Sequence, residues 1–131
     1  MTSGYVTASF DLLNIRDLDV ISQALSHCEH LIVGVLSDDC IETWHGRPPV
    51  IPLDERAELV GHLRGVSEVF VVHDPTVSPL LPSDCVVFAV DGEAPGFKTT
   101  SPPLVIHPTR ETQSTVLRQA LRRVPDTAVV A

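Results

Sequence analysis

One apolar run constrains the fold of this chain more than any other segment. It spans residues 30–37 and contains Leu31-Ile32-Val33-Gly34-Val35-Leu36, almost without a polar interruption. Runs of this kind are typical of a strand in a parallel sheet, because such a strand is covered on both faces. Parallel neighbours must be joined by crossover connections, which are usually helices. The run therefore predicts a layered structure of strands and helices.

Short apolar segments and segments with helical periodicity alternate along the chain. Strands are predicted at residues 4–10, 30–37, 68–73, 85–90 and 103–107. Helices are predicted from Asp17, as the N-cap, to Leu25, from Pro52 to Gly65, and over residues 111–123. Residues 38–50 are expected to form a polar loop, and the proline-rich residues 75–82 at most one helical turn.

This alternation predicts the fold class. We expect an α/β, Rossmann-like domain, in which a parallel five-stranded sheet carries helices on both faces. In such sheets ligands bind outside the carboxyl ends of the strands, at the point where the strand order reverses. The turn after the first strand, residues 8–17, should lie at that edge.

Length and composition limit the kinds of protein that the chain can be. Its 131 residues are expected to form a single domain over residues 1–131, which could also be one domain of a longer chain. No apolar run approaches the roughly 20 residues of a membrane span, and residues 1–5 show no signal segment. We therefore expect a cytoplasmic protein with no membrane partner. Cys28, Cys40 and Cys85 have no paired spacing and are expected to be free thiols.

The formal net charge of -8 argues against a nucleic-acid partner, because backbone phosphates require a basic face. It does not exclude a nucleotide. One triphosphate can be held by a few cations, by backbone N–H groups at a helix start and by Mg²⁺. The available cations are Lys98 and eight arginines. No metal site of the protein's own is expected, because the group His27-Cys28-x-His30 lacks a fourth ligand.

The turn after the first predicted strand carries the most specific motif, Ser9-Phe10-Asp11-Leu12-Leu13-Asn14-Ile15-Arg16-Asp17. It resembles the first signature of the small cytidylyltransferases, the glycerol-3-phosphate and ethanolamine-phosphate type. In that family a strand runs into a Gly-Thr-Phe-Asp turn, and His-x-Gly-His then opens a helix. Here the two histidine positions hold Asn14 and Asp17, and the glycine position holds Arg16.

The resemblance continues in order along nearly the whole chain. Residues 31–39 resemble the second strand with its Ser-x-Asp end, residues 46–56 the following loop and helix start, and residues 64–69 the Arg-x-Val-Asp-Glu-Val motif. The fourth strand should end in Gly-Asp-Asp, of which Asp91 remains. The last signature, usually Arg-Thr-x-Gly-x-Ser-Thr-Thr, corresponds to residues 109–116, where Ser114 and Thr115 match and Arg110 is displaced by one position.

The resemblance implies an activity and a set of site residues. The substrates would be CTP, bound with Mg²⁺, and a small phosphorylated or phosphonylated alcohol, and the protein would be a homodimer. Asp11 and Arg47 would contact the alcohol substrate, and Asn14, Arg16 and Asp17 occupy the catalytic positions. The nucleotide would be bound by Ala8, Ser9, Phe10, Arg64, Asp91, Arg110, Ser114 and Thr115.

The substitutions at the catalytic positions predict impaired transfer. The family reaction needs donors aimed at the charge that develops as pyrophosphate leaves. The amide of Asn14 could still donate one hydrogen bond, and Arg16 could clamp a phosphate or fill the pocket. The carboxylate of Asp17 would repel the triphosphate, unless it serves as an N-cap or binds Mg²⁺. The alternative is a non-catalytic relative that serves nucleotide sensing, dimerisation or the support of an active partner.

Several of the other candidates also have a purely structural interpretation. Asp11 could bond its own backbone in the turn, and Arg47 could be solvated in its loop. Arg64 could end a helix favourably against the helix dipole, and Ser114 and Thr115 could cap the last helix. His107, at the end of the fifth strand, could replace a missing phosphate donor or lie on the surface.

Overall fold

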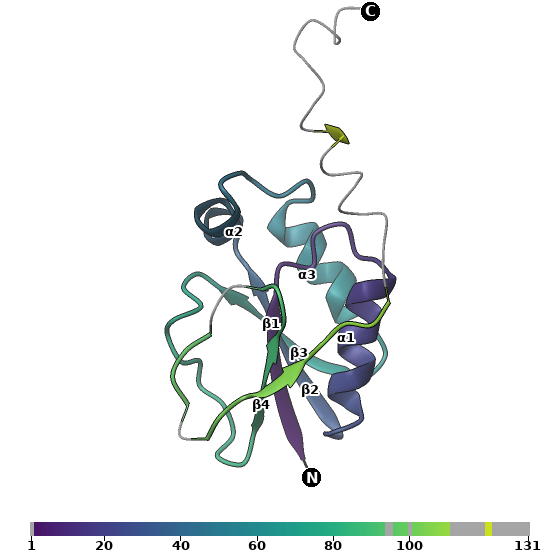
Figure 1. Cartoon of the computed structure of the whole chain (residues 1–131), viewed down its shortest axis with the longest axis vertical. Helices are drawn as coiled ribbons and strands as arrows, with labels where there is room; N and C mark the ends of the chain where they lie inside the picture. The colour runs from purple at the N-terminus through teal and green to yellow at the C-terminus, as the bar shows by residue number, and fades with distance from the viewer. Residues whose placement is uncertain (1, 94–95, 100, 111–119, 122–131) are drawn as a thin grey trace, which may run out of the picture.

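The computed structural model describes residues 2–93, 96–99, 101–110 and 120–121. Within them the chain forms a five-stranded sheet with the strand order β3-β2-β1-β4-β5. Every paired neighbour is parallel. The strands are β1 (Ser3–Ala8), β2 (His30–Leu36), β3 (Val66–Val72), β4 (Val86–Val90) and β5 (Leu104–Ile106). All five predicted strands are therefore confirmed (Figure 1).

The strand order places a switch point beside the first strand. The chain runs outward from β1 to β2 and β3, and then returns to β4 on the other side of β1. Connections that diverge from two adjacent strands leave a crevice at their carboxyl ends, where ligands bind in open parallel sheets. The turn that follows β1 lies at this crevice, as its sequence position predicts.

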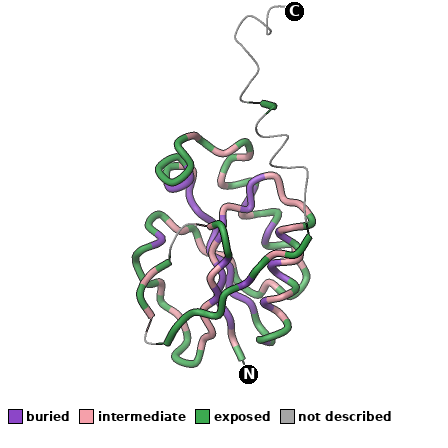
Figure 2. The backbone as a smooth tube through the Cα atoms, in the orientation of Figure 1, coloured by how far each residue is buried: buried purple, intermediate pink, exposed green. Residues whose placement is uncertain are grey.

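One face of the sheet is covered by α1 (Ile15–Leu25) and α3 (Leu53–Gly61). Their apolar side chains, among them Val20, Ile21 and Val60, pack in one buried cluster with Val6 and Val33 of the central strands. Figure 2 shows this burial concentrated in the middle of the sheet. Because these helices pack closely against β1 and β2, the positions of the first helix and of the turn before it are fixed by the core.

The opposite face is covered by α2 (Asp38–His45) near the carboxyl end of the sheet. Its residues Cys40 and Ile41 form a second apolar cluster with Leu36 and Val72. The predicted arrangement of helices on both faces is thus confirmed. Farther along this face, no helix connects β3 to β4, as the prolines of residues 75–82 predict. Tyr5, Phe70 and Phe97 line an apolar groove there.

The α2 helix corrects the prediction of a polar loop over residues 38–50. Its N-cap is Ser37, whose side chain accepts a hydrogen bond from the Cys40 N–H at 3.2 Å, and two aspartates occupy its first turn. Both features stabilise a helix start. The helix ends at Gly46, whose φ of 75° is the left-handed conformation in which glycine commonly ends helices. These signals are present in the sequence, but the helix is short and its polar residues obscure them.

Two further helix boundaries differ from expectation. The helix that follows Pro52 ends at Gly61 and not at Gly65, and Gly65 instead forms a turn with φ of 92° directly before β3. The N-cap of α1 is Asn14 and not Asp17. The last predicted helix, residues 111–123, falls almost entirely outside the described residues, and Ser114 and Thr115 lie there too.

A buried arginine, Arg56 of α3, joins the segments that surround the crevice. Its side chain is fully buried and donates to the carbonyl oxygens of Ser9 and Leu36, each at 2.7 Å, and of Ile51 at 2.8 Å. Its remaining nitrogen forms an ion pair with the Asp38 carboxylate at 2.6 Å. One side chain thus connects the turn after β1, the end of β2, the start of α2 and the loop before α3.

We expect Arg56→Met to lower the free energy of unfolding by about 3–5 kcal/mol, because three backbone carbonyls would lose their donor in a buried site. Urea denaturation measures this loss. Asp38→Asn is the matched control: Asp38 is half exposed and asparagine keeps an acceptor, so the loss should stay near about 1 kcal/mol. Equal losses of stability in the two variants would contradict the conclusion that the bonds of the arginine to the three carbonyls stabilise the fold.

Candidate functional site

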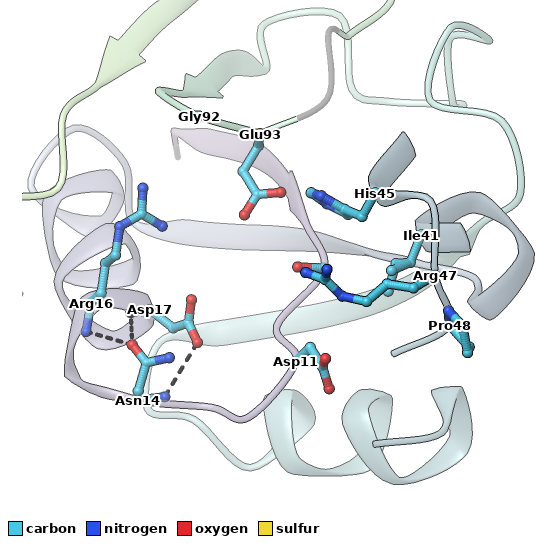
Figure 3. A pocket seen from close by; sticks show the side chains of 11 residues that line it. Asp11, Asn14, Arg16, Asp17, Ile41, His45, Arg47, Pro48, Gly92 and Glu93 are labelled. Atoms are coloured by element: carbon cyan, nitrogen blue, oxygen red, sulfur yellow. Dashed lines mark hydrogen bonds between the residues drawn. The ribbon is translucent and has the colours of Figure 1, made fainter. Parts of the chain in front are cut away.

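A pocket of about 290 Å³ lies at the carboxyl edge of the sheet, at the predicted switch point. Six residues that the sequence singled out line it, namely Ser9, Asp11, Asn14, Arg16, Asp17 and Arg47. They come from the turn after β1, from the start of α1 and from the loop after α2 (Figure 3). The structure therefore brings together the residues on which the first motif and the loop motif depend.

The start of α1 is closed by a reciprocal capping box. The Oδ1 atom of Asn14 accepts from the backbone N–H groups of Arg16 at 2.9 Å and Asp17 at 3.3 Å. In return, the Asp17 carboxylate accepts from the backbone N–H of Asn14 at 3.2 Å. Such pairing satisfies helix amides that have no partner within the helix. The asparagine and aspartate at the motif's histidine positions thus act together as a structural cap.

The capping box changes what these residues can offer a ligand. The side-chain amide of Asn14 donates to the Leu12 carbonyl at 2.8 Å, so one of its two N–H donors is engaged within the turn. The N–H groups of Arg16 and Asp17 bond to Asn14, although amides at a helix start are the groups that usually bind phosphate. The cap thus uses two backbone amides and part of the Asn14 side chain within the protein.

Asp11 anchors the loop on the other side of the pocket. Its carboxylate oxygens accept from the backbone N–H groups of Val50 at 3.0 Å and Ile51 at 2.9 Å. The side chain is buried. It lines the pocket and also holds the loop that carries Arg47. These two backbone partners lie 39 and 40 residues away in the sequence, and because Asp11 also lines the pocket, its expected contact with the substrate stays a prediction.

The turn around Asp11, after β1, has an unusual backbone. Phe10 and Leu12 adopt positive φ values of 53° and 55°, which are uncommon for residues other than glycine and asparagine. Phe10 and Ala8 are buried in the main core cluster and hold the turn in place. Both were expected to bind nucleotide, but neither lines the pocket. Their observed contribution is to support Ser9 and Asp11, which do.

The two arginines of the pocket project from opposite walls (Figure 3). Arg16 extends from α1 toward the end of β4, where its Nη2 donates to the carbonyl oxygen of Asp91 at 3.1 Å. Arg47 extends from the loop after α2, and His45 lies beside it on that wall. The pocket can therefore offer cations to two anionic groups at separate positions.

Among the pocket residues that were not predicted, two have polar side chains. Glu93 projects into the pocket from the loop after β4, and His45 ends α2. Glu93 reaches the pocket because Gly92 turns the chain with φ of 87°, a left-handed conformation that favours glycine. The preceding strand and the Asp91-Gly92 pair could have indicated the turn, but no sequence signal indicated the direction of the glutamate.

The remaining predicted residues are not in the pocket. Arg64 directly precedes Gly65 and the first residue of β3, and so lies at the opposite, amino edge of the sheet. Asp91 directly follows β4 beside the pocket, where its carboxylate lies 3.5 Å from Nδ1 of His107. Arg110 is exposed next to α1, where its backbone hydrogen-bonds to Asp19.

The described residues contain no group of three or more histidines, cysteines, aspartates or glutamates that could hold a metal ion. Cys28, Cys40 and Cys85 are free thiols, as expected. No helix among the described residues is long and apolar enough to span a membrane. The chemistry that the pocket offers is thus that of charged and hydrogen-bonding side chains arranged around the start of α1.

Comparison with known proteins agrees with this arrangement. Residues 5–128 match the model of a family described as cytidylyltransferase-like. Among curated relatives, FAD synthase of Thermococcus onnurineus is 37% identical over 68 residues, which cover 52% of this chain and 45% of the relative. Ethanolamine-phosphate cytidylyltransferase of Arabidopsis thaliana is 37% identical over 65 residues, which cover 50% of this chain and 15% of the relative.

The bifunctional protein HldE of Hyphomonas neptunium is 32% identical over 76 residues, which cover 56% of this chain and 15% of the relative. The chain thus spans less than half the length of these curated relatives. The lipopolysaccharide core biosynthesis protein of Thermoplasma volcanium superposes with a TM-score of 0.59 at 12% identity. The match covers 86% of this chain and 98% of that one, and it supports the fold alone. With the family model spanning nearly all of its length, the chain belongs to the cytidylyltransferase-like family and is a nucleotidyltransferase-type domain.

Proposed function

We propose that this domain binds CTP together with Mg²⁺ in the pocket at the carboxyl edge of the sheet, and that its transfer of the nucleotide to a small phosphorylated or phosphonylated alcohol is impaired. One observation carries the proposal. The residues at the two histidine positions of the motif, Asn14 and Asp17, are joined in a capping box at the start of α1. Shape and cations for binding are present, whereas the positions of the motif's two histidine donors hold side chains that cap the helix.

The charges of the pocket support nucleotide binding. Arg16 and Arg47 supply two permanent cations, and the carboxylates of Asp11 and Asp17 accept backbone hydrogen bonds. A hydrogen-bonded carboxylate presents less of its charge to a neighbouring anion than one that bonds only to water. The pocket can therefore admit a triphosphate despite its acidic residues, particularly when Mg²⁺ accompanies the nucleotide.

Mg²⁺ fits this site as a companion of the nucleotide. The ion prefers phosphate and carboxylate oxygens and is usually held by one or two carboxylates together with substrate phosphates. Glu93, which lines the pocket, is the residue that would hold it, because the Asp17 carboxylate is engaged in the capping box. When bound, the ion would neutralise charge on the triphosphate. The side chains of the protein would orient the nucleotide and its acceptor.

The loss of histidines accounts for impaired transfer. Binding needs attractive contacts in the ground state, but turnover needs donors that strengthen as the transition state forms. Removing one such donor typically lowers the rate by about 10²–10³-fold. In this chain the side chains of Asn14 and Asp17 bond to the backbone of their own helix start. Arg16 is the remaining cation on that wall of the pocket.

The opposite wall suits the acceptor. Arg47 and His45 lie together at the end of α2, away from Arg16 (Figure 3). A guanidinium and an imidazole can both donate hydrogen bonds to a phosphate or phosphonate. We propose that this wall binds the acceptor's anionic group. The names of the curated relatives point to more than one nucleotide reaction, so ATP belongs in every binding experiment beside CTP.

The alternative proposal is a domain with no transfer activity, which serves nucleotide sensing, dimerisation or the support of an active partner. The capping box favours this alternative too, since a helix start built for stability is compatible with the complete loss of chemistry. We further propose that the domain forms a homodimer and acts in the cytoplasm. A turnover assay distinguishes impaired transfer from a domain with no transfer activity. A binding assay does not, because nucleotide sensing and impaired transfer both require the nucleotide to bind.

We expect calorimetric titration to detect CTP binding in the presence of Mg²⁺. Arg16→Ala should weaken the affinity about tenfold, because it removes a charged donor from the pocket. Arg64→Ala is the matched control, since it removes the same charge at the opposite edge of the sheet and should leave the affinity unchanged. No heat and no thermal shift at millimolar CTP or ATP would refute the binding proposal.

Pyrophosphate release from CTP and phospho-alcohols should be near background in the unmodified chain. The double variant Asn14→His, Asp17→His restores both donors, keeps Arg16 and removes the acidic side chain, so we expect its release rate to rise at least about 10²-fold. Losing the cap should lower its stability by about 1–2 kcal/mol. Robust turnover by the unmodified chain would show that other residues perform the chemistry.

The double variant Asn14→Ser, Asp17→Glu is the control for the reversion. Serine followed three residues later by glutamate is the preferred capping-box pair, so the variant keeps the structural arrangement without introducing a histidine. We expect it to unfold at nearly the same urea concentration as the unmodified chain and to remain inactive. If it gained as much activity as the histidine variant, the gain could not be assigned to restored donors.

A further inference from the structure

A segment that follows β5 is fastened to the side of α1 by one carboxylate. The Oδ2 atom of Asp19 accepts from the backbone N–H of Thr109 at 2.8 Å and from the Thr109 hydroxyl at 3.1 Å. Gln23, one turn later on α1, donates to the same oxygen at 3.1 Å and to the carbonyl of His107 at 3.0 Å. Two residues of the first helix thus hold residues 107–109 at two points.

The charge of Asp19 is suited to this contact. Hydrogen bonding lowers its pKa, and the largest cause is the backbone N–H of Thr109, with the backbone of Arg110 contributing as well. Hydrogen bonds that involve an ionised carboxylate are stronger than those between neutral groups. The carboxylate therefore remains charged near neutral pH and favours the docked arrangement of Thr109 and Arg110.

The fastened segment reaches the wall of the pocket that Arg16 forms. Nδ1 of His107 lies 3.5 Å from the Asp91 carboxylate, and the carbonyl oxygen of Asp91 accepts from Arg16 at 3.1 Å. Arg16 and His107 are therefore both tied to Asp91, directly after β4. Local sequence alone would not bring Arg16 to this place, because Arg16 and Asp91 lie 75 residues apart along the chain.

We propose that Asp19 is a positioning residue for the phosphate end of the nucleotide: by fastening residues 107–110 to α1, it holds His107 beside Asp91, whose carbonyl oxygen accepts from Arg16, and so keeps this pocket arginine in the arrangement that receives the terminal phosphates. Asp19 does not line the pocket itself. Its effect comes from preorganisation, since a loop that is already ordered loses less entropy when a ligand binds. The inference rests on the proposed binding of a nucleoside triphosphate.

The experiment compares Asp19→Ala and Asp19→Asn with the unmodified chain by two measurements. Hydrogen exchange should show faster exchange of the Thr109 and Arg110 amides in Asp19→Ala, without any nucleotide present. Calorimetry with Mg²⁺ should show CTP affinity about tenfold weaker in Asp19→Ala, while CMP affinity stays unchanged because CMP lacks the terminal phosphates. Asp19→Asn keeps an acceptor oxygen and should recover part of the loss. Glu58→Ala removes an exposed carboxylate from α3 and should change neither measurement.

The outcomes separate this inference from the function on which it rests. If the unmodified chain binds neither CTP nor ATP, the proposed function and this role both fail, even where exchange at Thr109 confirms the contact. If CTP binds and Asp19→Ala weakens CTP and CMP equally, Asp19 supports the fold in general and the positioning role is wrong. Unchanged exchange and unchanged CTP affinity would show that the contact has no effect on the segment.

Discussion

The arrangement of this pocket depends on the buried guanidinium of Arg56. A charged side chain in a domain core is stable only when its donors are satisfied, and here three backbone carbonyls and one carboxylate satisfy them. Because those partners belong to four different segments, none can move far without leaving a buried donor unpaired. Asp11 adds a second constraint by bonding the backbone of the loop before α3. Together they shape the pocket, Arg56 from outside its lining and Asp11 from within it.

The start of α1 shows how the same fold can carry a stabilising helix cap in place of catalytic donors. In the motif that the sequence resembles, two histidines occupy this helix start, and here Asn14 and Asp17 form reciprocal hydrogen bonds with the backbone. A helix start has a few amides that lack partners, and they can be satisfied either by a ligand or by the protein's own side chains. In this chain the capping side chains satisfy these amides, so the amides are not left for a ligand. This competition gives the substitutions a physical meaning beyond the loss of two catalytic groups.

The strands and the edge of the sheet that binds ligands could be predicted because they follow from local signals. The run Leu31–Leu36 has few alternatives to a central parallel strand, and the turn after β1 then falls at the switch point. The predictions failed where contacts between distant segments determine the local structure. No local pattern identifies Asn14 as the N-cap in preference to Asp17, gives Arg56 its four partners or directs Glu93 into the pocket. Arg64 matched a motif, yet its place before β3 puts it at the far edge.

Asn14 and Asp17 act as one structural unit, and a double-mutant cycle on the free energy of unfolding tests this coupling most directly. Urea denaturation would compare Asn14→Ala, Asp17→Ala and the double variant with the unmodified chain. We expect Asn14→Ala to be destabilising by about 1 kcal/mol, and the losses to be non-additive by at least about 0.5 kcal/mol because the two hydrogen-bonding groups are reciprocal. Single variants that leave stability unchanged would contradict this coupling, and the two positions would then have to be explained by contacts with a ligand.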